Sequence, residues 1–199
     1  NGASLAGLVS YPFLIEPAIL LKTQAWVWSA GFGFFALACG WCALRQRSAP
    51  PAEPAVQESS SMTVVTALDR LLWLLWPACG SVLLLATTSQ LTQNVAVVPL
   101  LWIVPLTLYL LTFVICFDNP IWYWRPMWMA GLPLALGCVL MAPFFVSKVP
   151  LVVQVVAYCV AMFIGCMVCH GELARLKPPA LRLTGFYLSI AAGGALGGL

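Results

Sequence analysis

Charge is what this sequence has least of, because Asp, Glu, Lys and Arg make up only 8% of its 199 residues. A soluble globular domain carries roughly 25% charged residues. A chain with so few charges cannot cover its surface with solvated groups, which excludes an ordinary soluble domain. Its nine basic residues are spread along the chain and form no basic patch, so we expect no nucleic-acid partner.

Catalytic motifs are lacking as well. The sequence has no glycine-rich dinucleotide fingerprint after a strand, no phosphate-binding P-loop and no H-E-x-x-H motif. It has a single histidine, and no two carboxylates stand at catalytic spacing on one helix. We therefore expect neither an enzyme active site nor a metal site in this chain.

What the sequence has in excess is apolar residues, at 62% of the chain and a mean hydropathy of +0.98. Apolar runs of about twenty residues span the hydrocarbon core of a bilayer as helices. The runs are apolar all round, whereas barrel strands would alternate. The sequence therefore predicts an all-α, polytopic transmembrane helix bundle. Its predicted membrane segments are 2–21, 24–44, 67–89, 94–117, 127–146, 150–170 and 182–199.

These segments divide the chain into 1–44, with two membrane segments, a flexible linker at 45–65, and a five-segment bundle at 66–199. The linker is rich in Pro, Ala, Ser and Glu. Thr66 and Asp69 have the spacing of a capping box at the start of the next helix. Pro105 predicts a kink in its segment. The chain starts at Asn1 rather than Met and stops inside an apolar run, so we expect a piece of a longer polypeptide.

The basic residues predict how the segments are oriented. On one side the loops hold Arg45, Arg47, Arg70, Arg125, Arg175, Lys177 and Arg182, and on the other side only Lys22 and Lys148. Positive residues favour the cytoplasmic side. The pattern predicts that the linker at 45–65 is cytoplasmic.

Cys166, Cys169 and His170 match the C-x-x-C-H pattern of haem c attachment. We reject this cofactor, because the predicted orientation places His170 at the cytoplasmic end of its helix and haem c is attached on the opposite side. His170 is then an interfacial histidine, a substrate or proton-relay residue, or an axial ligand to a tetrapyrrole. No cofactor is predicted.

Other polar residues near the membrane are candidates for a substrate pathway. Glu16 stands inside an apolar run, and Pro17 is expected to force it out of helical geometry and so to break the helix. The polar stretch 87–94 predicts a turn that either lines a vestibule or only joins two helices. The pathway candidates are Glu16, Thr88, Gln93, Asn94, His170, Glu172 and Tyr187.

The last segment carries small residues four positions apart, at Gly185, Ser189, Gly193 and Gly197. This spacing lets helix backbones approach closely. We expect the segment to pack tightly against another helix of this chain or of another membrane subunit.

Four stretches occur in order along nearly the whole length of the chain: YPFLIEP at 11–17, VAVVPLLWIVPLTLYLLTF at 95–113, CHGELARLKP at 169–178, and LTGFYL with GGALGG at 183–198. Together they resemble the membrane region of bacterial proteins in which a major-facilitator-like transporter is fused to a spermidine-synthase-like domain. The resemblance implies that an aminopropyltransferase-like domain would follow this chain. That family often has Asp where Asn94 stands, which removes a carboxylate from any cation-coupled role of this stretch.

Two functional hypotheses follow. The first is a transporter-like domain in the lipid bilayer that handles a small organic cation such as a polyamine. The alternative is a non-catalytic structural subunit of a larger respiratory or photosynthetic membrane complex, packed against partner helices, lipids or pigments.

Overall fold

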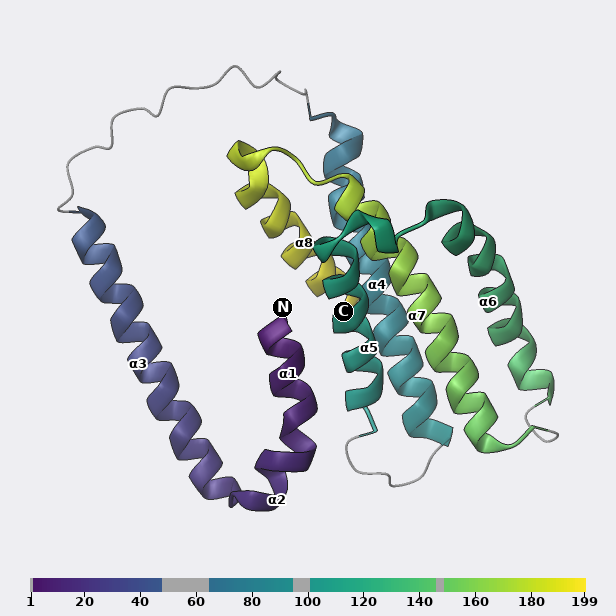
Figure 1. Ribbon diagram of the computed structural model, residues 1–199, viewed down its shortest axis with the longest axis horizontal. Helices are drawn as coiled ribbons and strands as arrows, with labels where there is room; N and C mark the ends of the chain where they lie inside the picture. The colour runs from purple at the N-terminus through teal and green to yellow at the C-terminus, as the bar shows by residue number, and fades with distance from the viewer. Residues whose placement is uncertain (1, 48–64, 95–100, 146–148) are drawn as a thin grey trace. The chain divides into compact units, whose positions relative to one another are not determined.

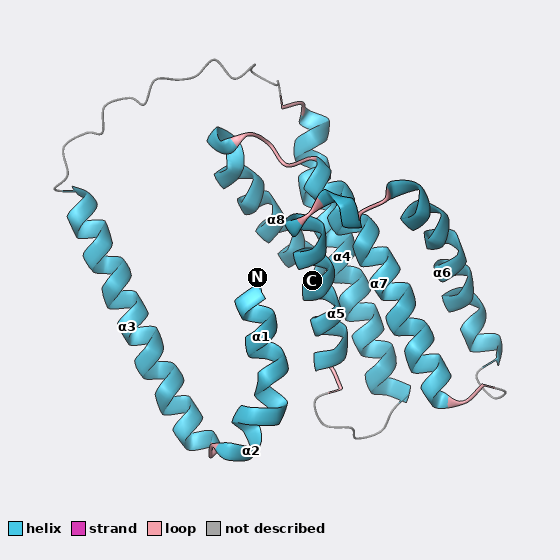
Figure 2. Ribbon diagram, viewed as in Figure 1, coloured by secondary structure: helices cyan, strands magenta, loops and turns pink. Residues whose placement is uncertain are grey.

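The computed structural model describes residues 2–47, 65–94, 101–145 and 149–199. All regular secondary structure in these ranges is helical (Figure 2). The chain divides into two compact units, one comprising Ser10–Val64 and the other Asn1–Val9 with Val65–Leu199. The predicted linker at 45–65 falls almost wholly outside the described residues, although its first part, up to Arg47, is helical.

The smaller unit begins at the last residue of α1 (Gly2–Ser10). It contains the π-helical turn η1 (Tyr11–Ile15), the short α2 (Glu16–Ala18) and the long α3 (Leu21–Arg47). The prediction that Pro17 forces Glu16 out of helical geometry is wrong, because Glu16 has φ −60° and ψ −47°. Pro17 lies in the first turn of α2, where its missing N–H is not needed. The chain becomes extended at Ile19 instead, with φ −128° and ψ 126°.

The side chain of Gln24 stabilises this break. Its amide nitrogen donates to the Ile19 carbonyl oxygen over 2.7 Å, and its amide oxygen accepts a hydrogen bond of 3.0 Å from the Tyr11 hydroxyl. Gln24 is buried, so these bonds supply the partners that water would otherwise provide.

The larger unit is a helix bundle centred on α4 (Ala67–Asn94) and α7 (Leu151–Arg175), which pack against each other (Figure 1). α8 (Leu183–Gly197) packs on α4, while α5 (Ile103–Asp118) and α6 (Arg125–Phe145) pack on α7. The short helical turns η2 (Pro120–Trp122) and η3 (Ala180–Arg182) lie in the connections before α6 and α8. Every residue of α7 from Gly165 to Gly171 is buried, which makes this stretch the core of the unit.

The start of α4 confirms the predicted capping box. The Asp69 carboxylate accepts hydrogen bonds of 2.8 Å from both the backbone N–H and the hydroxyl of Thr66. The Asp69 N–H donates in turn to the Thr66 hydroxyl over 3.2 Å. These bonds satisfy donors that the first turn of a helix leaves free.

The polar stretch 87–94 is not the predicted turn but the last two turns of α4. The Thr88 hydroxyl donates to the Leu84 carbonyl over 2.7 Å, and the Thr92 hydroxyl donates to the Thr88 carbonyl over 3.0 Å. Because these hydroxyls bond to their own helix, polar residues can continue it. Pro105 lies in the first turn of α5 and not at a mid-helix kink, since that helix starts at Ile103.

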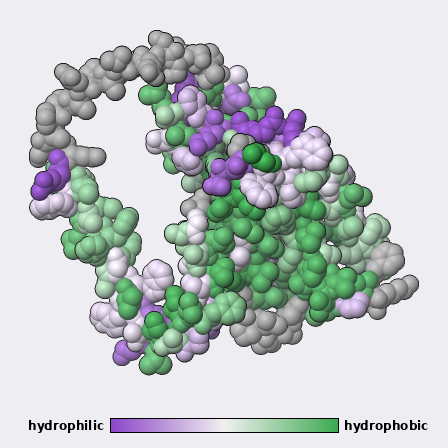
Figure 3. All heavy atoms as spheres, viewed as in Figure 1, coloured by the Kyte–Doolittle hydropathy of each residue, from purple (hydrophilic) through white to green (hydrophobic). Residues whose placement is uncertain are grey.

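Four helical stretches in the described ranges are long and apolar enough to cross a membrane: Leu21–Arg45, Ala67–Gln93, Arg125–Ala142 and Leu151–Arg175. α5 is a shorter apolar helix. In the larger unit, hydrophobic residues cover the flank of the helices, and hydrophilic residues gather at the end where α4 begins and α7 ends (Figure 3). These features are those of a multi-pass membrane protein, as the predicted all-α membrane bundle requires.

α4 and α8 approach each other at two glycines of α8. A Cβ atom on Gly193 would overlap the carbonyl oxygen of Leu74, and one on Gly197 would overlap that of Ala78. Since both pairs of numbers rise together, the two helices run parallel here. Gly185 has open space where a Cβ would stand, and the Ser189 hydroxyl donates to the Gly185 carbonyl of its own helix over 2.9 Å.

Gly193→Ala should therefore force α4 and α8 apart and lower the stability by about 1–3 kcal/mol, the usual cost of overpacking. Gly185→Ala is the matched control, because its methyl group meets nothing and alanine favours helix by about 1 kcal/mol. Thermal unfolding in detergent measures both variants. Equal stability of the two variants would contradict the close approach at Gly193.

Candidate functional site

The candidate site centres on His170, which lies near the end of the buried stretch of α7 and is only 1% exposed. Two aromatic rings of α5 meet the imidazole at steep angles. The ring centroid of Tyr109 is 4.8 Å from that of His170, and the centroid of Phe113 is 5.2 Å away. The imidazole is therefore enclosed by side chains and not by solvent.

Thr112 of α5 is the hydrogen-bond partner of His170 Nδ1. The Thr112 hydroxyl donates to the Tyr109 carbonyl over 2.8 Å. The hydroxyl oxygen also lies 3.0 Å from His170 Nδ1, and which group donates in this contact depends on the tautomer of the ring. In the neutral tautomer with its proton on Nδ1, Nε2 keeps its lone pair.

His170 Nε2 is buried and has no hydrogen-bond partner within the described part of the chain. It faces Gly80 of α4, where an added Cβ would stand 3.4 Å from Nε2 and 3.3 Å from Cε2 of Tyr109. The Tyr109 hydroxyl lies near the Ser81 side chain, also on α4. Three helices thus surround a buried nitrogen that has no described hydrogen-bond partner. Leaving such a group unsatisfied lowers the stability of the fold by about 1–3 kcal/mol.

Three buried cysteines lie in the same core. Cys116 of α5 has its Sγ 3.7 Å from the Met167 carbonyl oxygen and 3.8 Å from Met167 Sδ. Cys166 and Cys169 are buried inside α7, which continues beyond them to Arg175. The described residues contain no cluster of three side chains able to hold a metal ion.

Glu172 lies one half-turn beyond His170 and organises the polar end of the bundle. One carboxylate oxygen accepts hydrogen bonds from the Tyr123 hydroxyl at 2.9 Å and from Arg125 Nε at 2.8 Å. Arg175 Nη1 lies 3.2 Å from the same oxygen. The Glu172 side chain is 12% exposed, against 57% for Arg125 and 52% for Arg175, so the carboxylate is the sheltered partner.

Gly171 makes room for this arrangement, because a Cβ there would overlap the Tyr123 ring. Tyr123 itself is buried in the connection between α5 and α6. This burial raises the pKa of the Tyr123 hydroxyl, and the neighbouring Glu172 carboxylate raises it further.

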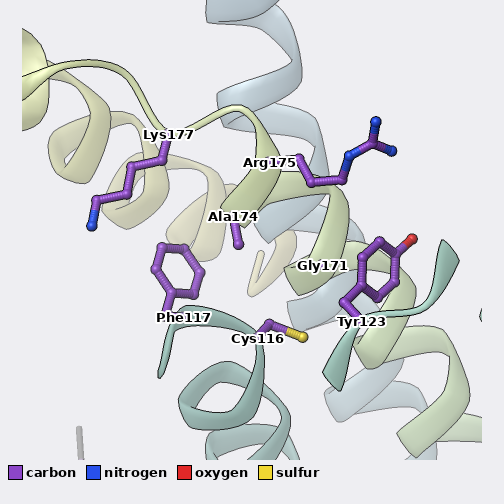
Figure 4. Close-up of a pocket in the computed structure, with 7 residues that line it drawn as sticks. All are labelled: Cys116, Phe117, Tyr123, Gly171, Ala174, Arg175 and Lys177. Carbon is purple, nitrogen blue, oxygen red and sulfur yellow. The ribbon is translucent and has the colours of Figure 1, made fainter. Parts of the chain in front are cut away.

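A hollow of about 410 Å³ opens beside this cluster (Figure 4). Its floor is formed by Cys116, Phe117, Gly171 and Ala174, and its rim by Tyr123, Arg175 and Lys177. The side chains of Arg175 and Lys177 point away from each other in Figure 4. The hollow therefore combines an apolar floor with a divided basic rim.

Among the predicted pathway residues, the structure brings together His170 and Glu172 on α7. Thr88 and Gln93 lie on the last turns of α4, two or more turns beyond Gly80, and Gln93 donates to the Ser89 hydroxyl over 2.9 Å. Tyr187 is 46% exposed. Glu16 is exposed in the other compact unit, and the Asn94 side chain lies outside the described residues.

Several residues of the site are absent from the sequence-based prediction. Thr112, Tyr109 and Gly80 contact His170 from other helices, and Tyr123 and Arg125 contact Glu172 from positions more than forty residues away. Only the Glu172–Arg175 contact can be predicted from the sequence, because residues three positions apart are neighbours on the surface of a helix.

No family model, no curated protein and no solved structure matches this chain.

Tyr123→Phe should lower the stability by about 1–3 kcal/mol, because it removes a hydrogen bond to a sheltered carboxylate. The raised pKa of Tyr123 gives this loss a pH dependence. Above the ordinary tyrosine value of 10.0 the unfolded chain ionises before the folded protein does, so the advantage of wild type is full below pH 10 and fades above it.

Thermal unfolding between neutral and alkaline pH measures this difference. Tyr187→Phe is the matched control, since that exposed tyrosine makes no described hydrogen bond through its hydroxyl. A loss in Tyr123→Phe no larger than that in the control would contradict a structural role for the Tyr123–Glu172 bond.

Proposed function

We propose that this chain is a transporter-like domain of a bacterial inner membrane that handles a small organic cation such as a polyamine. The observation that carries the proposal is the buried His170 Nε2, which has no hydrogen-bond partner among the described residues and lies at the junction of α4, α5 and α7. A polar group left unsatisfied inside a membrane bundle lowers stability, so its retention points to a function.

The chemistry around His170 suits an alkylammonium group. The imidazole lone pair accepts an N–H hydrogen bond, and the rings of Tyr109 and Phe113 attract a cation through their π faces. The site carries no charge of its own, so it would release its ligand more readily than a carboxylate pair would. Weak, reversible binding is what transport requires.

The described conformation is a closed one, because His170 is only 1% exposed. Access requires α4 to move relative to α5 and α7. Transporters of this kind work by rocking one group of helices against another around a site near the middle of the membrane. Gly80, which brings the α4 backbone next to His170 Nε2, lies at the contact where that movement would occur.

The orientation follows from the basic residues. Arg70 at the start of α4, Arg125 at the start of α6 and Arg175 at the end of α7 lie at one end of the bundle (Figure 1). By the positive-inside rule this end is cytoplasmic, as is the linker at 45–65. The resemblance to transporter and synthase fusions supports the same placement and a non-catalytic role for this chain.

The alternative proposal is a structural subunit of a larger complex, in which the small residues of the last helix contact partner subunits. This argument is weakened because Gly193 and Gly197 already pack against α4 of this chain. Transport is therefore the better proposal.

His170→Leu tests it. The variant removes the lone pair but leaves Thr112 bonded to the Tyr109 carbonyl, so the fold should keep its stability to within about 1–2 kcal/mol while uptake falls at least about tenfold. Uptake of labelled spermidine into proteoliposomes is the measurement. Cys159→Ser, on the same helix but away from the imidazole, is the control and should transport normally.

Normal uptake by a folded His170→Leu protein would remove His170 from the site. Absence of uptake by the wild-type protein, for spermidine and for simpler diamines, would overturn the transport proposal itself.

A further inference from the structure

α4 and α8 diverge from their close contact toward the end where both helices begin. Backbones touch at Gly193 and Gly197, yet at Gly185, two turns earlier on α8, an added Cβ would meet nothing within 4 Å. A hollow of about 590 Å³ opens where the helices separate. We call it the α4–α8 groove.

The α4–α8 groove has a rigid floor. Trp73 of α4 is buried, packs edge-on against Phe186 at 5.3 Å between ring centroids, and donates its indole N–H to the Leu176 carbonyl over 3.1 Å. This fixed ring separates the groove from the core. The groove is thus a built feature and not a gap that side chains would close.

Two arginines line the groove, Arg70 from α4 and Arg182 from η3. No ion pair holds either of them within the described residues. The nearest acid in sequence, Asp69, accepts two hydrogen bonds from Thr66. The other hollow differs, because its Arg175 is paired with Glu172. Among the described residues, the α4–α8 groove therefore holds two arginines that have no ion-pair partner.

The walls of the groove are apolar and open outward. Leu181 is 86% exposed and Leu188 is 70% exposed, and both line the groove. Leu188 lies on an apolar helix of the bundle, two turns from its basic end. Positive charge at a membrane interface next to exposed leucines is complementary to one kind of molecule, a lipid with an anionic head and apolar tails.

We propose that the α4–α8 groove binds the phosphate group of an anionic phospholipid. The guanidinium groups of Arg70 and Arg182 take the phosphate oxygens, since arginine presents paired N–H donors that match this geometry. The acyl chains lie along Leu181 and Leu188. Basic pockets between membrane helices on the cytoplasmic side bind such head groups. A soluble phosphate ester would satisfy the arginines but leave both leucines uncovered.

Gly185 acquires a role in this proposal. It stands in the same series as Gly193 and Gly197 but packs against nothing, so it keeps the groove open instead of bringing two helices together. A larger side chain there enters the groove without changing its charge, and its Cβ meets nothing within 4 Å.

The test is native mass spectrometry of the full chain in mild detergent, with equal amounts of phosphatidylglycerol and phosphatidylcholine. Arg182→Gln should lower the preference for phosphatidylglycerol at least about tenfold, because it removes charge-assisted hydrogen bonds to the phosphate, and Arg70→Gln should do the same. Lys177→Gln is the matched control, with the same charge change at the same end of the bundle but in the other hollow. It should lower the preference by about fivefold at most, the diffuse effect of one basic residue at a membrane surface.

Gly185→Leu should abolish the preference while leaving thermal stability unchanged. Three results would each overturn the proposal: equal effects of Lys177→Gln and Arg182→Gln, which indicate diffuse surface attraction; full preference in Gly185→Leu; or displacement of the lipid by a large excess of inorganic phosphate, which indicates a site for soluble phosphate. If either arginine variant fails to fold, the other variant and Gly185→Leu decide the question.

Discussion

The absence of side chains at a few glycines is the constraint on which the rest of this bundle depends. Gly193 and Gly197 let α8 touch the backbone of α4, and Gly171 makes room for the Tyr123 ring that binds Glu172. Gly80 leaves space beside His170 Nε2. In an apolar environment, where burial of surface drives little helix association, such close backbone contacts supply much of the attraction between helices.

The polar groups of the bundle fall into two kinds. Most are satisfied: Asp69 caps α4, Glu172 accepts from three donors, and the hydroxyls of Thr88 and Thr92 bond to their own helix. His170 Nε2 and the Thr107 hydroxyl of α5 are different, since both are buried without a described partner, and of these two only the imidazole is shown to meet side chains of α5 and the backbone of α4. That contrast, within one bundle, is the reason to place the function at His170.

α4 connects the two proposed sites. Its Gly80 faces His170, while its Arg70 and Trp73 line the groove that it forms with α8. Trp73 is also bonded to the carbonyl of Leu176, one residue after α7 ends. A helix movement that opens the His170 site would therefore act on a helix whose N-terminal end is held by that indole and, in our proposal, by a lipid head group.

The sequence by itself determined the all-α, apolar bundle and the cap at Thr66 and Asp69, because apolar length and a spacing of three residues act locally. Of the seven predicted membrane segments, four contain described helices long and apolar enough to cross a membrane. It misplaced the break near Glu16 and the polar end of α4, since local preferences there are weak and hydrogen bonds within the helix prevail. Only the tertiary structure decided that Tyr123 and Arg125 meet Glu172, or that Gly193 packs closely while Gly185 lines a groove. The two glycines have the same spacing in the sequence, and the angle at which two helices cross, which no single helix encodes, makes them different.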